Sequence, residues 1–449
     1  MPTVLHLKPE EIDTTEKRGK YTVSVVGCGQ KGVLYATAFA EAGFKVICTD
    51  ADQSLVKRLA KGKTPFSERE MESKLKNFMR TGQLSATNEL KSAISRSDII
   101  IMTIATKIDD KKSADYSEVE SSCKQAGAGL SRGTLFIYGG IAGFGFTEGV
   151  IKESLENTSG LKAGEDFGLV YNPIQVSEDQ PVASIANQEL MVAATDKTSL
   201  AAGSTVLSTI TKKVVKQTLD VKTAELAMLF KVAQRDANIA LANEFAVFCE
   251  NSGTDYFETL KLLDINESSF FPTIAEEENR SEAYLLLENA ENLNTKLRLP
   301  ALARQINEDM VRHAVNLTQN TLRSCGKTLR RARIAVLGTV KPKTAAENFV
   351  RMLEAKGAKI SRYDPLFSKN ELLDAPRELK RSLNEAVEGT DCMVILTGQD
   401  QFKRLNLKKL QAIMKMPAAI VDLAGIIEPQ KVEKEGFIYS GLGRGTGKK

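Results

Sequence analysis

The chain is poor in residues that bind metal ions or form disulfide bonds. Its six cysteines are scattered along 449 residues, and its two histidines are His6 and His313. No two cysteines have the spacing of zinc ligands, so no structural zinc site is expected. Isolated cysteines are typical of a reducing compartment, where disulfides do not persist. We therefore expect a cytoplasmic protein that holds no metal.

Long apolar segments are missing as well. Residues 1–20 are polar and charged, without the apolar core of a signal peptide. The longest apolar runs, such as residues 99–102, have the length of a strand and are far too short to span a membrane. The net charge is only +4. So small a net charge gives no reason to expect nucleic acid or a membrane surface as a partner.

What the chain does contain is the composition of a folded globular protein. Apolar residues make up 42% and charged residues 26%, whereas a disordered chain has fewer apolar residues and a larger net charge. Its length suggests two or three domains. Short β-branched, apolar segments alternate with helical segments, which is typical of parallel sheets covered by helices on both faces. The expected strands are residues 21–26, 45–49, 99–104, 134–138, 333–338, 359–363, 392–397 and 418–421.

The middle of the chain has a different pattern. Residues 223–250 contain neither glycine nor proline, and their apolar residues recur at helical spacing over roughly seven turns. A second helical segment covers residues 300–323. The apolar stripe of the first helix predicts either a structural spine or a helix at a homodimer interface.

A glycine-rich turn follows the first expected strand. Residues 27–32 read Gly-Cys-Gly-Gln-Lys-Gly and open a helix expected over residues 33–42. In such a turn Gly27 permits the tight bend, Gly29 lets the backbone approach a pyrophosphate, and Gly32 allows close packing of helix against sheet. The N–H groups at the start of the helix then face the phosphates.

The surrounding residues complete a dinucleotide-binding pattern. Cys28, Gln30 and Lys31 supply the rest of the turn, and Cys28 is interpreted as a small filler rather than a nucleophile. Asp50 stands 18 residues after the last glycine, at the end of the next expected strand. A carboxylate there hydrogen-bonds the ribose hydroxyls and repels a 2′-phosphate. The pattern predicts an NAD site; the alternative is a glycine turn kept only for packing.

Several segments resemble the nucleotide-sugar 6-dehydrogenases, the UDP-glucose/GDP-mannose dehydrogenase family. Residues 235–244, which read Arg-Asp-Ala-Asn-Ile-Ala-Leu-Ala-Asn-Glu, are specific to its UDP-N-acetylmannosamine dehydrogenase branch. The resemblance covers nearly the whole chain. The other segments that carry it are residues 40–46 (Ala-Glu-Ala-Gly-Phe-Lys-Val), 62–65 (Gly-Lys-Thr-Pro), 161–167, 171–173 (Tyr-Asn-Pro) and 436–445.

This resemblance implies an architecture and two ligands. Members of the family join two Rossmann-like, doubly wound α/β domains by a long helix that also forms the dimer. One domain holds NAD, and the other holds the UDP end of a sugar nucleotide. For this chain the resemblance implies an NAD-binding domain over residues 1–218, a helical central domain over 219–328 and a UDP-sugar-binding-like domain over 329–449. It also places Thr106 near the nicotinamide-side ribose.

The resemblance further implies four contacts to the UDP-sugar. They are Asn172, Arg235, Asn238 and Lys341. For Arg235 and Asn238 a structural alternative is equally open, namely an ion pair of the arginine with Asp236 or a dimer contact, because ion pairs on helix surfaces are common.

The chemistry of the family requires residues that this chain does not have at the matching positions. Its enzymes oxidise a primary alcohol to a carboxylate in two NAD-dependent steps, and a cysteine thiolate traps the intermediate aldehyde. That cysteine lies in a Gly-Gly-x-Cys-x-Pro-x-Asp loop. Here residues 273–282 read Thr-Ile-Ala-Glu-Glu-Glu-Asn-Arg-Ser-Glu, and Glu278 falls at the cysteine position.

Three more positions and one turn differ in the same way. The family's catalytic lysine and its asparagine partner correspond to Met228 and Val232, and neither side chain can transfer a proton. Ile174 replaces the glutamate that follows Tyr-x-Pro, and the family's Ser-Thr turn reads Gly-Gly-Ile-Ala-Gly-Phe-Gly over residues 139–145. Lys231 lies one helical step from Met228, either as a substitute proton carrier or as a solvated surface residue.

Three hypotheses follow from this pattern. The chain is an NAD-binding homologue that has lost the four-electron oxidation and acts by binding, for instance as a partner of an active paralogue. Alternatively, it is an NAD-dependent oxidoreductase with two-electron chemistry on a UDP-sugar or a hydroxy acid. The third hypothesis is an ordinary UDP-N-acetyl-hexosamine dehydrogenase whose catalytic residues lie elsewhere. Fold alone does not choose among them.

Overall fold

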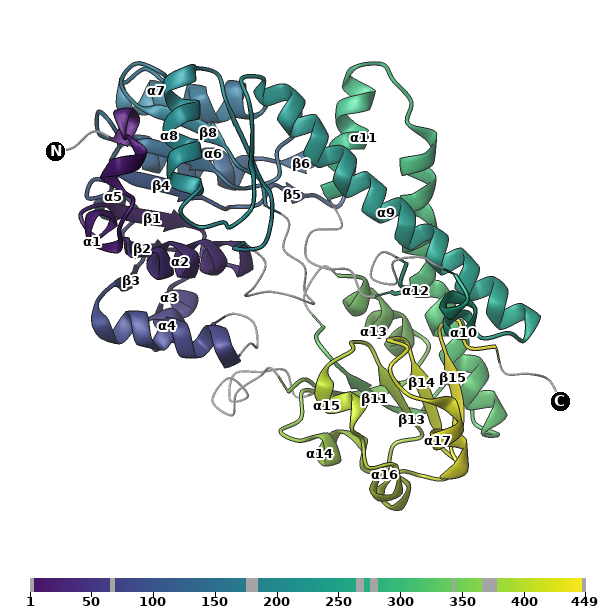
Figure 1. Ribbon diagram of the computed structural model, residues 1–449. Helices are drawn as coiled ribbons and strands as arrows, with labels where there is room; N and C mark the ends of the chain where they lie inside the picture. The colour runs from purple at the N-terminus through teal and green to yellow at the C-terminus, as the bar shows by residue number, and fades with distance from the viewer. Residues whose placement is uncertain are drawn as a thin grey trace. The chain divides into compact units, whose positions relative to one another are not determined.

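The computed structural model describes residues 4–64, 69–174, 185–263, 270–274, 282–340, 344–365 and 378–445. The chain forms two compact units (Figure 1). Unit 1 comprises Met1–Val232 and Tyr284–Thr295, and unit 2 comprises Ala233–Ala283 and Lys296–Lys449. The helical middle of the chain is thus divided between the two units. The separate helical domain expected over residues 219–328 stays a prediction.

Unit 1 is built on an eight-stranded sheet with the order β10-β9-β8-β7-β4-β1-β2-β3. A two-stranded hairpin, β5 (Lys107–Ile108) with β6 (Ala114–Asp115), lies outside it. The strands of the large sheet are β1 (Thr22–Val26), β2 (Lys45–Thr49), β3 (Leu84–Thr87), β4 (Ile99–Met102), β7 (Leu135–Tyr138), β8 (Gly168–Tyr171), β9 (Leu190–Ala194) and β10 (Val215–Thr218).

Both faces of this sheet are buried. Ile99 and Ile101 of β4 belong to one apolar core with helices α2 and α8, whereas Ile100 and Met102 belong to a second core with helices α6 and α7. Successive side chains of a strand point to opposite faces, so a continuous apolar run requires helices on both sides. The predicted doubly wound fold is therefore confirmed in unit 1.

Short helices connect and cover these strands. The prediction that the first helix stops at Gly43 is confirmed, because this glycine ends α2 with φ +104°. The helices are η1 (Val4–His6), η2 (Pro9–Glu11), α1 (Thr15–Arg18), α2 (Gln30–Ala42), α3 (Gln53–Ala60), α4 (Arg69–Thr81), α5 (Leu90–Ile94), α6 (Ser117–Gly127), the π-helix η3 (Thr147–Ile151), α7 (Lys152–Ser159), α8 (Lys197–Leu207) and α11 (Ala283–Asn292).

One strand pairing differs from the expected parallel sheet. Strand β9 runs antiparallel to β8, although β10 is again parallel to β9. The residues that connect β8 to β9 include no helix among those that the structure describes. Antiparallel neighbours do not need the crossover helix that parallel neighbours require.

The long helix of the middle segment is α9 (Val221–Ser252), which extends the predicted helix by two residues at each end. It passes from unit 1 into unit 2. Gly253, with φ +74°, follows its last residue. The second predicted helix is α12 (Arg298–Ser324), with Pro300 in its first turn, where no intrahelical N–H bond is lost.

Unit 2 contains a five-stranded parallel sheet with the order β12-β11-β13-β14-β15. Its strands also alternate between two apolar cores, which confirms the second doubly wound domain. The strands are β11 (Arg333–Leu337), β12 (Lys359–Tyr363), β13 (Cys392–Ile395), β14 (Ala419–Asp422) and β15 (Ile438–Gly441). The remaining helices are α10 (Tyr256–Lys261), α13 (Ala345–Ala355), α14 (Leu383–Val387), α15 (Asp400–Lys403), α16 (Leu407–Ile413) and α17 (Pro429–Lys434).

Candidate functional site

The glycine turn after β1 has the geometry that its sequence predicts. Gly27 has φ +85°, a backbone conformation that favours glycine, and its carbonyl oxygen accepts a hydrogen bond from Thr103 Oγ1 at 2.6 Å. A Cβ on Gly32 would overlap the Gly27 carbonyl oxygen. Around Gly29, in contrast, no atom of the described residues other than its own and those of its two chain neighbours lies within 4 Å of the position of a Cβ. The turn thus leaves space at the one glycine where a pyrophosphate needs it.

The first turn of α2 adds an open anion site to this space. Its N-cap is Gly29, which has no side chain to accept from the N–H groups of the first turn. Gln30 and Lys31 begin the helix, and Lys31 is only 8% exposed. Free N–H groups and the helix dipole favour a phosphate at such a terminus.

Asp50 lies beside the turn, at the end of β2. One oxygen of its carboxylate accepts the backbone N–H of Cys28 at 2.6 Å, and the other accepts the N–H of Asp52 at 2.9 Å. A carboxylate oxygen can accept more than one hydrogen bond, so ribose hydroxyls still find an acceptor there. The structure therefore places Asp50 next to the turn, as an NAD site requires.

Cys28 serves as a filler. Its side chain is fully buried, with Sγ 3.6 Å from the carbonyl oxygen of Val25 and 3.5 Å from that of Thr49. A side-chain hydrogen bond with Cys48, together with burial, raises the pKa of the Cys28 thiol well above its usual value. A neutral, buried thiol is not a nucleophile.

The loops that follow β4 and β7 approach the turn from the other side. Thr106, in the loop after β4, is 5% exposed and donates its hydroxyl to the carbonyl oxygen of Ile141, 3.2 Å away in the loop after β7. In a doubly wound sheet, a dinucleotide crosses from the turn after β1 toward these strands. Contact of Thr106 with the cofactor remains a prediction.

Tyrosines pack against the glycines in the loop after β7. A Cβ on Gly140 would lie 2.5 Å from the Tyr138 hydroxyl, and one on Gly143 would overlap the Tyr116 hydroxyl. Burial, with smaller effects from Glu288 and Glu225, raises the pKa of Tyr116 to about 12. The tyrosine is therefore neutral near pH 7 and can donate a proton to a hydrogen bond but cannot serve as a base.

Asn172 and Ile174 are both buried at the end of β8. The Asn172 amide accepts the Tyr35 hydroxyl at 2.5 Å and donates to the carbonyl oxygen of Met191 at 2.7 Å, and the residue has no exposed surface. Ile174 is 2% exposed. A sugar contact by Asn172 would have to replace one of these bonds, so its role as a substrate residue stays a prediction.

The α9 positions that the resemblance aligns with the family's catalytic lysine and asparagine lie in the protein interior. Met228 is 5% exposed and Val232 is 7% exposed. Lys231, in contrast, is exposed, as its interpretation as a surface residue predicts. Glu278 and Lys341 lie outside the described residues.

The carboxylate of Asp236 on α9 binds residues of α12 inside unit 2. Asp236 is 4% exposed and pairs with Arg304 of α12, itself 3% exposed, at 2.8 Å. Asn307 of α12 donates to the same carboxylate at 2.9 Å and accepts from Asn243 at 3.0 Å. A buried carboxylate needs a buried cation and hydrogen bonds, and Arg304 and Asn307 supply them here. The ion pair of Arg235 with Asp236 stays a prediction.

Residues 235–244 therefore carry a structural signal as well as a family signal. Asp236 and Asn243 join α9 to α12 inside unit 2, whereas Arg235 and Asn238 are half-buried. Sugar contacts by Arg235 and Asn238 remain predictions.

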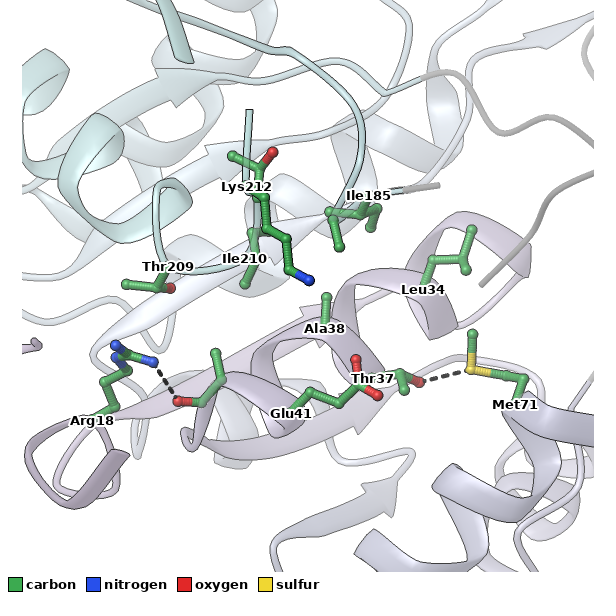
Figure 2. Close-up of a pocket in the computed structure, with 13 residues that line it drawn as sticks. Arg18, Leu34, Thr37, Ala38, Glu41, Met71, Ile185, Thr209, Ile210 and Lys212 are labelled. Atoms are coloured by element: carbon green, nitrogen blue, oxygen red, sulfur yellow. Dashed lines mark hydrogen bonds between the residues drawn. The ribbon is translucent and has the colours of Figure 1, made fainter. Parts of the chain in front are cut away.

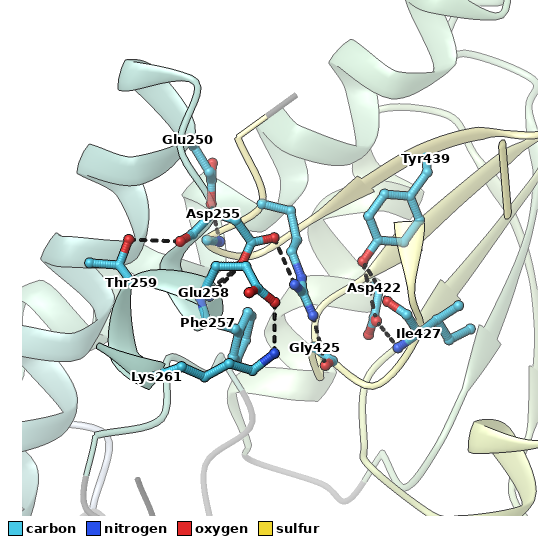
Figure 3. Close-up of polar contacts among 12 residues, drawn as sticks. Glu250, Asp255, Phe257, Glu258, Thr259, Lys261, Asp422, Gly425, Ile427 and Tyr439 are labelled. Carbon is cyan, nitrogen blue, oxygen red and sulfur yellow. Dashed lines mark hydrogen bonds and ion pairs between the residues drawn. The ribbon is translucent and has the colours of Figure 1, made fainter. Parts of the chain in front are cut away.

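In unit 2, the Asp422 carboxylate at the end of β14 is fully buried (Figure 3). It accepts the N–H groups of Ala424 at 3.0 Å and Ile427 at 2.8 Å, and the Tyr439 hydroxyl at 3.4 Å. Burial raises the pKa of this carboxyl, although the backbone donors oppose the shift. The aspartate thus holds the loop after β14.

The last described residues are attached to the start of α10, where Figure 3 also shows Asp255 and Phe257. Arg444 pairs with Asp255 at 2.7 Å and lies over the ring of Phe257, 4.2 Å from its centre. The N–H of Gly443 donates to Glu250 near the end of α9 at 2.9 Å. Residues 443–445 therefore stabilise the start of α10 rather than form a site.

A cavity of about 270 Å³ lies along the middle and end of α2, further along the helix than the glycine turn (Figure 2). Leu34, Ala38 and Met71 supply apolar lining, and the Lys212 ammonium group points toward it. Glu41 at its edge forms an ion pair with Lys74 at 2.7 Å. The cavity is thus separate from the phosphate-facing end of the helix.

The sequence patterns did not predict two side chains that bind the loop after β7. Glu225 of α9 has no exposed surface and accepts backbone N–H groups of the loop after β7, and Asn289 of α11 accepts another. The sequence feature that could have indicated Glu225 is an acidic residue on the apolar side of a long helix.

Metal sites, membrane-spanning helices and disulfides are absent from the described residues. Within the described ranges, no three histidine, cysteine or acidic side chains gather to hold a metal ion. None of the described helices is both long and apolar enough to cross a membrane. All six cysteines are free and buried.

Comparison with known proteins matches both units. Residues 21–215 match the NAD-binding domain of the UDP-glucose/GDP-mannose dehydrogenase family, and residues 343–429 match its UDP-binding domain. A UDP-N-acetyl-D-mannosamine dehydrogenase of Pyrococcus horikoshii is 28% identical over 437 residues, which cover 94% of this chain and 99% of that protein. A UDP-glucose 6-dehydrogenase of Rhizobium meliloti is 25% identical over 445 residues, 94% of this chain and 99% of that protein.

Solved structures give the same result. The structure of a UDP-D-ManNAc dehydrogenase from Pyrococcus horikoshii superposes with a TM-score of 0.80 at 26% identity, over 95% of this chain and all of that one. An NDP-N-acetyl-D-galactosaminuronic acid dehydrogenase from Methanosarcina mazei superposes with a TM-score of 0.71 at 25% identity, over 98% of each chain.

Proposed function

The chain belongs to the UDP-glucose/GDP-mannose dehydrogenase family, and from this premise we propose that it binds NAD and a UDP-sugar without the four-electron oxidation of that sugar. Its function is then one of binding, as a partner or regulator of an active paralogue in the cytoplasm. The names of its relatives make UDP-N-acetyl-hexosamines the first ligands to test.

The cofactor side of this proposal rests on the glycine turn. The open N-terminus of α2 would hold the pyrophosphate, and Asp50 would hold the adenosine ribose. NAD, when bound, supplies a hydride acceptor. Asp50 also makes NADP unfavourable, because its carboxylate would face the 2′-phosphate.

The loss of turnover rests on one observation, the pair of apolar side chains at Met228 and Val232. Both are buried on α9, and no gap separates them from the matching residues 235–244. Removal of a hydroxyl proton during the first oxidation needs a base, and general acid–base help contributes about 10²–10⁴ in rate. A carboxylate at the cysteine position is also a much weaker nucleophile than a thiolate.

The test is a stoichiometric assay with UDP-N-acetylmannosamine and NAD. We expect binding of both ligands in calorimetry but no NADH, or at most one NADH per sugar. Two NADH per sugar at several turnovers per second would contradict the proposal and support the ordinary-dehydrogenase hypothesis. Sustained formation of one NADH per sugar would agree with the loss of the four-electron oxidation but favour the two-electron alternative over a role in binding alone.

Two variants sharpen this assay. Met228→Lys combined with Val232→Asn restores the proton-transfer pair and should raise formation of the first NADH above the parent protein. Lys231→Ala is the matched control on the same helix. Loss of a residual rate in this control would show that Lys231 acts as the proton carrier, whereas an unchanged rate supports its surface role.

We also propose that a second copy of the chain covers α9. Leu241, Phe245 and Phe248 follow one another at helical spacing and are 39%, 49% and 71% exposed. Phe230 on the same helix is 59% exposed. Large exposed apolar residues in a row are typical of interaction sites. Light scattering at micromolar concentration should give a dimer, and a mass of 49.1 kDa would contradict this.

A further inference from the structure

Two side chains hold the backbone of the loop that follows β7. Glu225 accepts the N–H of Gly145 with Oε2 at 2.6 Å and the N–H of Thr147 with Oε1 at 2.8 Å. Asn289 accepts the N–H of Phe144 with Oδ1 at 2.5 Å. Three backbone donors within four residues are therefore bound by side chains that lie far away in the sequence.

The conformation of this loop needs such acceptors. Gly145 has φ +77°, and the π-helix η3 begins at Thr147. The first N–H groups of a helix have no partner within it, and a π-helix is an uncommon conformation that occurs often near functional sites. Without Glu225, the N–H groups of Gly145 and Thr147 would lose their acceptor.

Burial of a carboxylate costs free energy, so Glu225 is an unfavourable residue for a merely structural contact. The residue has no exposed surface, and burial raises the pKa of its carboxyl against the effect of the two backbone donors. An unsatisfied buried carboxylate is strongly unfavourable, so the two hydrogen bonds must persist in the folded protein. The loop is therefore tied to one position relative to α9.

The sheet order shows which half of the cofactor this loop faces. Asp50 ends β2, on one side of β1, whereas β4 and β7 follow on the other side. A dinucleotide with its adenosine at Asp50 crosses the turn after β1 and extends its nicotinamide half toward the ends of β4 and β7. The bond from Thr106 to Ile141 already links the loops of those two strands.

We infer that Glu225, assisted by Asn289, is a positioning residue for the nicotinamide half of NAD. It acts through the loop of residues 143–147, which it holds at the ends of β4 and β7. This inference rests on NAD binding at the glycine turn.

The experiment compares NADH with ADP, which carries the adenosine half and both phosphates but no nicotinamide riboside. Calorimetry with the full chain should show that Glu225→Gln weakens NADH binding by about tenfold or more, because the amide presents a donor to an N–H group. The affinity for ADP should stay within about twofold. The fluorescence of NADH bound to this variant should also change, because the nicotinamide loses its fixed environment.

A matched control lies directly after this loop, in η3. Glu148 forms a partly exposed pair with Lys222 at 3.5 Å, and Glu148→Gln should leave both affinities unchanged. Asn289→Ala is the second variant, for the case that Glu225→Gln does not fold. It removes one neutral acceptor and should weaken NADH binding by about threefold, again without an effect on ADP.

The outcomes separate the possible failures. Equal loss of NADH and ADP affinity in either variant would show a general structural role and overturn the inference. Unchanged NADH affinity in a folded Glu225→Gln or Asn289→Ala protein would overturn it as well. Parent protein that binds neither NADH nor ADP would show instead that the cofactor assignment at the glycine turn is wrong.

Discussion

The turn after β1 and the turn after β11 each connect a strand to a helix, but the two helix N-termini are capped differently. The N-cap of α2 is Gly29, which has no capping side chain. The N-cap of α13 is Thr344, whose hydroxyl accepts the N–H of Glu347 at 3.3 Å. An N-cap hydroxyl satisfies a donor that a phosphate would otherwise bind. The comparison indicates that α2, whose N-cap has no side chain, is the helix with an N-terminus available to a phosphate.

The glycines of the two turns differ in the same sense. Gly32 is packed against the carbonyl oxygen of Gly27. Gly338, with φ +122°, is packed against Thr397, whose Oγ1 would lie 2.5 Å from a Cβ on this glycine. At Gly29 the position of a Cβ is open among the described neighbours. Among the residues that the structure describes, close packing is therefore common to both turns, and Gly29 of the first turn has free space.

The largest effect is expected from alanine at the packed glycines. Gly32→Ala and Gly338→Ala should each lower the free energy of unfolding by about 1–3 kcal/mol, because a Cβ has no room at either position. Only Gly32→Ala should also weaken NAD binding, by about tenfold or more, since it displaces the phosphate-facing turn. Urea unfolding and calorimetry measure the two effects.

Gly29→Ala is the control for packing. Its Cβ has space, so the free energy of unfolding should change by less than about 0.5–1 kcal/mol. NAD binding should nevertheless weaken, because the methyl group occupies the position where the pyrophosphate approaches. Equal NAD affinity in the Gly32→Ala and Gly338→Ala proteins would remove the distinction between the turns.

The smallest effect is expected at the capped helix. Thr344→Ala removes the hydroxyl that caps α13 and should cost about 1 kcal/mol of stability. NAD affinity should stay the same, since α13 belongs to the other unit. A thermal melt together with an NAD titration tests this, and a change in NAD affinity would count against the assignment of the cofactor to the first turn alone.

Much of the fold follows from local sequence patterns. The ends of β2 and β12 agree with the predicted strands residue for residue, and Gly43 ends α2 where its sequence predicts. These features depend on side-chain period and on the steric freedom of glycine, which act over a few residues. The sites outside the described residues, Glu278 and Lys341, stay predictions.

Local sequence patterns did not predict the partners of the buried polar residues. Asp236 pairs with Arg304, 68 residues away. Glu225 binds a loop 80 residues away at Gly145. A local pattern identifies an acidic residue on a helix, but the identity of its partner depends on which distant segments pack beside it.

The sequence by itself determined the two doubly wound sheets, the open glycine turn and the carboxylate beside it, because strand period, glycine sterics and residue type suffice for each. Tertiary structure decided the antiparallel pairing of β8 with β9, the tyrosines that fill the space beside Gly140 and Gly143, and the return of α11 to unit 1. The physical reason is that burial and hydrogen bonding between distant segments are settled when the chain packs, since each buried polar group must then find a partner.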